Sequence, residues 1–143
     1  MTDRQLALQA WESLFRAQHE LFVEMASDFD DAEITQAEYD VLLTVTRAEA
    51  MTARLRDITA NSLTSQPSVS RLVDRMVTRG LVSKRVDPDD GRGAIVTATD
   101  AGARAFRQMA TVHGRTIAER MSPLSDDELA ALLALTEKLR GRP

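Results

Sequence analysis

The hydrophobic positions at the start of the chain follow a helical repeat. Between Asp3 and Phe29, apolar side chains recur at steps of three and four residues, with charged side chains on the opposite face, which predicts one amphipathic helix. Such a helix is too long to cover one small core, so we expect its apolar stripe to need a partner helix. The stripe consists of Ala7, Trp11, Leu14, Phe15, Leu21, Phe22, Met25 and Phe29.

A capping box predicts where the second helix begins. Thr35 and Glu38 stand three residues apart, so the Thr35 hydroxyl can accept a hydrogen bond from a free backbone N–H while the Glu38 side chain reaches back. Residues 53–55 could then form one short strand. The predicted helix buries three aliphatic side chains, namely Val41, Leu42 and Val45.

Two helices separated by a tight turn are predicted next. The first covers residues 57–62. The second begins behind Thr64 as its N-cap, carries Pro67 in its first turn and ends before Gly80, which are the positions where these residue types are favoured. Its inward stripe is Val69, Leu72, Val73 and Met76.

After Gly80 the hydrophobic period changes from 3.6 to 2. Residues 81–86 and 94–98 read as strands, and turn-forming residues fill positions 87–93, so we predict a β-hairpin with a long polar tip. Two further helices follow, one from Thr99 to about Met121 and one behind a second capping box at Ser125 and Glu128.

Taken in order, these elements describe a winged helix-turn-helix. We therefore expect a mainly α fold with a small β-hairpin wing, built as a single domain over residues 1–143. Residues 33–98 would form the winged lobe, and residues 1–32 and 99–143 would form the helices that flank it.

Charge is distributed unevenly along the chain. The net charge of −4 at first argues against a nucleic-acid partner. Residues 51–93, however, carry 8 basic and 5 acidic side chains, whereas the remainder carries 10 basic and 17 acidic ones. The surplus of positive charge therefore falls on the predicted winged lobe.

The composition argues against several classes of function. The chain has no cysteine, and its two histidines, His19 and His113, match no metal-ligand spacing. Neither a Ser-His-acid arrangement nor a glycine-rich phosphate loop is present, so we expect no enzyme and no bound metal or cofactor. Neither a signal peptide nor a membrane span is indicated, and we expect a soluble cytoplasmic domain.

The predicted recognition helix and hairpin carry groups that suit DNA. Arg71 and Arg75 lie one turn apart on the outward face, long enough to reach a guanine or a phosphate, and Asp74 could orient an arginine. Arg92 stands between two glycines near the hairpin tip, with Asp90 placed to hold its guanidinium, which suits a narrow minor groove. Solvated arginines on an ordinary surface are the alternative interpretation.

Residues 66–82 resemble the recognition helix of the MarR (multiple antibiotic resistance regulator) family. Residues 87–93, Asp-Pro-Asp-Asp-Gly-Arg-Gly, resemble the family's wing. Residues 98–102, Ala-Thr-Asp-Ala-Gly, are similar to its Leu-Thr-Glu-x-Gly segment, with Ala98 in place of the usual leucine. Ile34-Thr35-Gln36 is similar to the common Leu-Thr start of its second helix, so the resemblance covers residues 35–102 by motif.

The resemblance implies a homodimeric transcription regulator, by family habit a repressor, that binds double-stranded DNA at a pseudo-palindromic operator. Residues 1–32 and 99–143 would interlock as dimerisation helices. A dimer whose winged lobe binds protein instead of DNA is the alternative function. The candidate DNA-binding residues are Arg54, Arg56, Thr64, Ser65, Gln66, Ser68, Ser70, Arg71, Arg75, Asp90 and Arg92.

The resemblance also implies a small, often aromatic or phenolic effector that weakens DNA binding. Dimer core is the favoured explanation for Trp11 and Phe15, and a buried, hydrogen-bonded histidine is the favoured explanation for His113. Because the family's thiol-based oxidation sensors need a cysteine in the first helix, that mode of sensing is excluded. The candidate residues for the effector pocket are Trp11, Phe15, His19 and His113.

Overall fold

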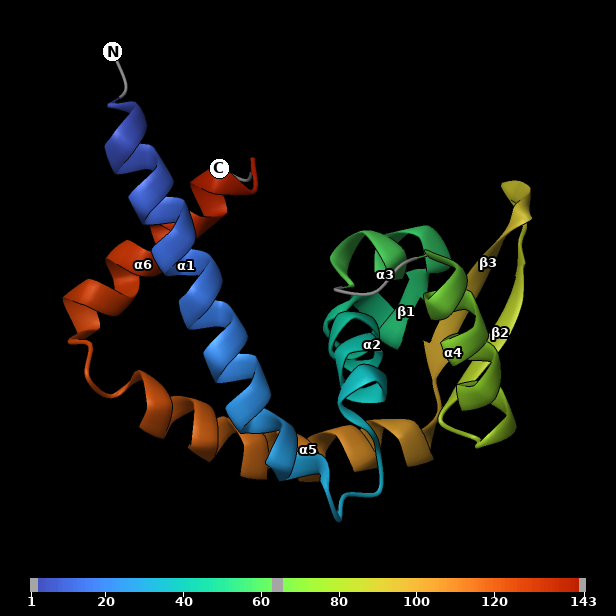
Figure 1. Ribbon diagram of the computed structural model, residues 1–143. Coiled ribbons are helices and arrows are strands. Elements are labelled where there is room, and N and C mark those ends of the chain that lie inside the picture. The colour runs from blue at the N-terminus through green and yellow to red at the C-terminus, as the bar shows by residue number, and fades with distance from the viewer. Residues whose placement is uncertain (1–2, 63–65, 142–143) are drawn as a thin grey trace. The chain divides into compact units, whose positions relative to one another are not determined.

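The computed structural model describes residues 3–62 and 66–141 (Figure 1). The chain divides into two compact units, one formed by Met1–Met25 with His113–Pro143 and the other by Ala26–Val112. No helix among the described residues is long and apolar enough to cross a membrane. The elements are α1 (Arg4–Met25), the 3₁₀ helix η1 (Ala26–Phe29), α2 (Gln36–Arg47), the 3₁₀ helix η2 (Glu49–Met51), β1 (Thr52–Arg54), α3 (Leu55–Asn61), α4 (Gln66–Thr78), β2 (Val82–Asp87), β3 (Asp90–Ala98), α5 (Asp100–Met121) and α6 (Asp126–Leu139).

The unit Ala26–Val112 is a winged helix-turn-helix, as predicted. Its three strands form one antiparallel sheet in the order β1-β3-β2, and helices α2, α3 and α4 enclose a core with this sheet. In Figure 1 the β2–β3 hairpin extends beyond α4 as a wing. The inward side chains predicted for α2 and α4 are all buried, namely Val41, Leu42, Val45, Val69, Leu72, Val73 and Met76.

Both predicted capping boxes are confirmed. The Thr35 hydroxyl accepts from the backbone N–H of Glu38 at 3.1 Å, and the Glu38 carboxylate accepts from the backbone N–H of Thr35 at 2.9 Å. Ser125 and Glu128 repeat the arrangement at the start of α6. Hydrogen bonds from the backbone and side chain of Ser125 lower the pKa of the Glu128 carboxyl, since they stabilise its ionised form.

Gly80 ends the recognition helix α4, as predicted. Its φ of 75° lies in the left-handed region that glycine adopts without strain. The N–H of Leu81 donates to the carbonyl of Met76 at 2.9 Å, and the N–H of Gly80 donates to the carbonyl of Val77 at 3.0 Å. These two hydrogen bonds end the helix in a Schellman-type turn. The chain is thereby turned directly into β2.

The wing has a shorter turn than the pattern predicted. Instead of a polar tip over residues 87–93, β3 already begins at Asp90, which pairs with Asp87 and leaves Pro88 and Asp89 as the turn. A register shift between Val86 and Asp87 accommodates the additional residues of β3. The register gives Gly91, Arg92 and Gly93 no partner in β2, so these residues form an irregularity within β3 next to the turn.

Helix α5 begins in close contact with the turn that follows α4. The Thr99 hydroxyl donates to the carbonyl of Gly80 at 2.6 Å and accepts from the N–H of Gly102 at 3.0 Å. A Cβ at Gly102 would lie 1.9 Å from the carbonyl oxygen of Leu81, so only glycine permits this approach.

Gly102→Ala should destabilise the protein by about 2–3 kcal/mol, because the new methyl group would collide with backbone that cannot move without displacing β2. Gly114→Ala, in the same helix but with nothing within 4 Å of the added Cβ, is the matched control. It should leave the stability unchanged or raise it by about 0.5–1 kcal/mol. Urea denaturation of both variants measures the difference, and equal stabilities would contradict the close contact at Gly102.

Candidate nucleic-acid interface

Helix α4 turns a polar face to solvent on the side opposite its buried stripe. Arg71, Asp74, Arg75 and Thr78 are exposed, as predicted, whereas Ser68 and Ser70 are half-buried. Gln66 is the first residue of the helix. Thr64 and Ser65 were also predicted as DNA contacts, but they lie outside the described residues.

The two arginines on this face keep their guanidinium groups available. Among the residues that the structure describes, neither Arg71 nor Arg75 has an ion-pair partner. The interpretation that Asp74 orients an arginine was wrong, since Asp74 accepts a hydrogen bond from Lys84 Nζ in β2 at 2.8 Å. The carboxylate therefore ties α4 to the wing and leaves the arginines unpaired.

Arg92 lies in β3, close to the tip of the wing, and its side chain is exposed. Asp90 does not hold the Arg92 guanidinium, contrary to the prediction. Its Oδ1 accepts instead from the backbone N–H of Arg92 at 3.1 Å. This contact fixes the backbone that carries the arginine, while the cationic end of the side chain remains in solvent.

Arg54 is engaged by the wing. Its Nε lies 3.1 Å from Asp87 Oδ2, and its Nη2 lies 3.4 Å from Asp89 Oδ2. The Asp87 side chain is only 4% exposed, so this pairing compensates a carboxylate that is withdrawn from water. The sequence predicted Arg54 as a phosphate contact, whereas the structure has it bracing β1 against the wing turn; the exposed Arg56 is better placed for a phosphate.

A hollow of about 200 Å³ beside the wing turn is lined by three arginines and by the carboxylates of Asp87 and Asp90. Arg54 ends β1, Arg56 lies in the first turn of α3, and Arg92 comes from β3. Arg54 is paired with Asp87 and Asp89, so the exposed cations of this surface are Arg56 and Arg92, together with Arg71 and Arg75 on α4. A surface of this kind can neutralise the phosphates of a nucleic acid.

The predicted effector residues all belong to the unit formed by Met1–Met25 and His113–Pro143. Trp11 and Phe15 stack at 5.4 Å between ring centroids and are 62% and 56% exposed. His19 is exposed, whereas His113 is 8% exposed. Because the hollow at the wing and the larger cavity of the winged unit are lined by other residues, this assignment stays a prediction.

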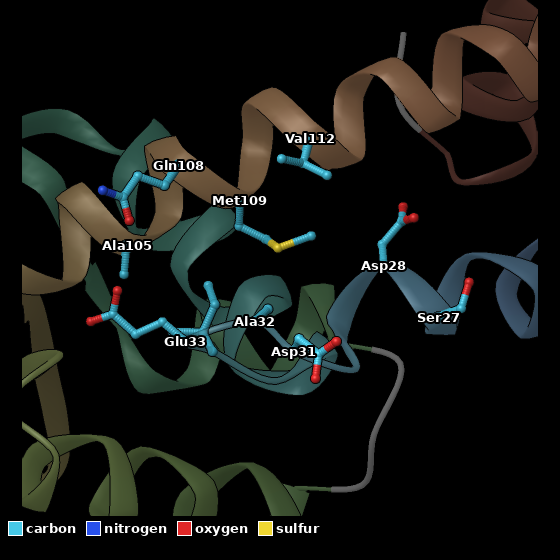
Figure 2. Close-up of a pocket in the computed structure, with 10 residues that line it drawn as sticks. Ser27, Asp28, Asp31, Ala32, Glu33, Ala105, Gln108, Met109 and Val112 are labelled. Atoms are coloured by element: carbon cyan, nitrogen blue, oxygen red, sulfur yellow. The ribbon is translucent and has the colours of Figure 1, made fainter.

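The larger cavity, of about 360 Å³, lies between α5 and the segment that precedes α2 (Figure 2). In Figure 2 the Met109 side chain projects from α5 toward this segment. The acidic turn around residues 28–33 was visible in the sequence, but nothing local indicated that α5 would close over it. The lining residues are Ser27, Asp28, Asp31, Ala32, Glu33, Ile34, Ala105, Gln108, Met109 and Val112.

Part of the chain is similar in sequence to known proteins. The family model described as MarR family matches residues 32–93. The multiple antibiotic resistance protein MarR of Escherichia coli strain K12 is 29% identical over 109 residues, which are 75% of this chain and 74% of that protein.

Two solved structures share the fold. Sco3205, a MarR family transcriptional regulator from Streptomyces coelicolor in complex with DNA, has a TM-score of 0.81 at 19% identity and covers 98% of this chain and 89% of its own. BpsR of Bordetella bronchiseptica has a TM-score of 0.77 at 22% identity, covering 92% of this chain and 93% of its own, and its DNA binding is regulated by 6-hydroxynicotinic acid.

Arg54→Gln should destabilise the protein by about 1–2 kcal/mol, because it leaves the buried Asp87 carboxylate without its cationic partner. Arg56→Gln is the matched control, since Arg56 is exposed two residues away and has no ion pair among the described residues. Urea denaturation compares the two variants. Equal stabilities would contradict a bracing role for Arg54.

Proposed function

We propose that the protein belongs to the MarR family, whose model matches residues 32–93, and that it is a sequence-specific DNA-binding transcription regulator. The observation that carries the proposal is the exposed pair Arg71 and Arg75 on α4, beside a wing that presents Arg92. A recognition helix of this kind enters a major groove, where arginine reads guanine. The wing arginine is suited to the adjacent minor groove, whose negative potential attracts it.

We propose that the regulator acts as a homodimer on a pseudo-palindromic operator. None of the described residues of α1 or α6 is buried, although both helices carry many large apolar side chains. So many exposed apolar side chains on two helices indicate an interaction site, and a second copy supplies both a complementary surface and a second winged lobe. The exposed residues include Leu6, Leu8, Trp11, Leu14, Phe15, Phe22, Val23, Leu133, Leu135 and Leu139.

In this proposal, residues 1–32 and 99–143 serve dimerisation, and residues 33–98 bind DNA. A small molecule weakens DNA binding, by analogy with BpsR, whose DNA binding 6-hydroxynicotinic acid regulates, and the protein is a cytoplasmic repressor without enzymatic activity. The cavity of about 360 Å³ beneath α5 falls within the size range of small-molecule pockets. It is therefore a candidate effector site in addition to the predicted residues Trp11, Phe15, His19 and His113.

Selection of random-sequence duplexes by the purified protein at about 150 mM salt, followed by sequencing, tests the proposal. We expect an inverted repeat with half-sites about one helical turn apart. The selection is repeated after unfolding and refolding, so that a co-purified ligand is removed. If neither preparation enriches any sequence, the lobe does not read DNA and the protein-binding alternative replaces the proposal.

Arg92→Ala and Arg71→Ala should weaken DNA binding in different ways. Loss of a phosphate-neutralising cation at the wing should flatten the slope of log affinity against log salt by about 0.9 for each phosphate that is no longer neutralised. Loss of a base-reading arginine should cost about 1–3 kcal/mol at particular base pairs and relax the preference there. Titrations of the selected duplex and of its base variants measure both effects. An unchanged slope for Arg92→Ala, or a uniform loss for Arg71→Ala, would contradict the assigned role.

Phe15→Glu should convert the dimer to single chains, because it places a charge in the apolar stripe of α1. Sedimentation velocity should show the mass of two chains for the unmodified protein and of one chain for this variant. Arg16→Gln, which removes only the surface pair with Glu12 at 2.9 Å, should leave the dimer intact. A single-chain mass for the unmodified protein would exclude the homodimer.

A further inference from the structure

One arginine connects the end of the recognition helix to two other parts of the winged unit. Arg79 follows α4 directly, and its Nη1 donates to both carboxylate oxygens of Glu38 at the start of α2. Its Nη2 donates to the backbone carbonyl of Glu33 at 2.7 Å. A single guanidinium thus joins α4, α2 and the segment that precedes α2.

The Glu38 carboxylate is buried and therefore depends on this contact. The Glu38 side chain is only 4% exposed, and the same carboxylate accepts from the backbone N–H of Thr35 at 2.9 Å. A carboxylate withdrawn from water needs its hydrogen bonds, because an unpaired buried charge is costly. Two acceptors in different directions also require two nitrogens in one rigid plane, which arginine provides and lysine does not.

One backbone hydrogen bond links Arg79 to Arg75 on the exposed face of α4. The N–H of Arg79 donates to the carbonyl of Arg75 at 3.0 Å, so the last turn of α4 and the backbone of Arg75 move together with Arg79. Apolar packing of Val73 and Met76 holds the helix on the core, but such packing is non-directional. The ion pair adds the directional constraint at this end of the helix.

We infer that Arg79 and Glu38 position α4 for sequence reading, and that Arg79 is a positioning residue, not a DNA contact. This inference rests on the proposed function. The pair fixes where the Arg75 side chain starts, and a shift of about 1 Å there is enough to misalign a bidentate contact with a base. Its loss should therefore reduce discrimination between sequences more than it reduces binding to DNA in general.

Arg79→Gln, Glu38→Gln and the double variant test this inference. Affinity is measured for the selected duplex and for an unrelated duplex of the same length, and thermal unfolding gives the folded fraction. We expect each single variant to bind the selected duplex about tenfold more weakly and the unrelated duplex as before, with no further loss in the double variant. Arg79→Lys, which keeps the charge but not the second hydrogen bond, should lose part of the discrimination and serves if the other variants do not fold.

Val45→Ala is the matched control, because it weakens the core from the same helix as Glu38 without touching the pair. It should lower the unfolding temperature but leave the ratio of the two affinities unchanged. If Arg79→Gln also leaves that ratio unchanged, the pair is merely structural and the inference is overturned.

The Glu38 variant separates positioning from direct contact. If Arg79 met a phosphate, its loss would weaken both duplexes and flatten the salt dependence, while Glu38→Gln would leave binding unchanged or strengthen it by removing a negative charge. That pattern would also overturn the inference. If the unmodified protein prefers no duplex at all, the proposed function fails, and the inference that rests on it fails as well.

Discussion

The arrangement of the winged lobe depends on hydrogen bonding to one buried carboxylate. The Glu38 carboxylate accepts hydrogen bonds from the backbone N–H of Thr35 and from the guanidinium of Arg79. These bonds join the start of α2, the end of α4 and the segment before α2 at one carboxylate. Burial makes each of these bonds costly to lose. Because Glu33 both lines the cavity beneath α5 and accepts from Arg79, the wall of that cavity lies one hydrogen bond from the residue that follows the recognition helix.

The same principle divides the arginines of the lobe into two groups. Arg79 and Arg54 each compensate a buried carboxylate, that of Glu38 and that of Asp87 respectively, and thereby hold the helix and the wing in place. Other arginines have no such partner among the described residues, and they include Arg71 and Arg75 of α4 and Arg92 of β3. The net charge of −4 is therefore compatible with DNA binding, because recognition depends on where unpaired cations lie and not on their total number.

Local patterns predicted the elements of this fold, whereas long-range contacts decided the details of the site. The capping boxes, the inward stripe of α4 and the end at Gly80 depend on residues within one or two turns, so sequence spacing was sufficient. The partners of Arg54 and Arg79 lie 33 to 46 residues away in the sequence, and no local signal identified them. The wing turn was misplaced for a different reason, since Asp87 pairs with Asp90 across Pro88 and Asp89 and residues 91–93 form an irregularity of β3 instead of the turn.

The contacts within a single chain do not explain the apolar stripe of α1. The pattern predicted a helix in need of a partner, and in the structure Trp11 and Phe15 stack on each other yet remain more than half exposed. Burying large aromatic and aliphatic side chains gives about 25 cal/mol for each Å² removed from water, so a stripe left in solvent forgoes a large stabilisation. In the proposed homodimer, a second copy covers this stripe and also supplies a second lobe, so one sequence feature would serve both stability and the reading of a two-fold operator.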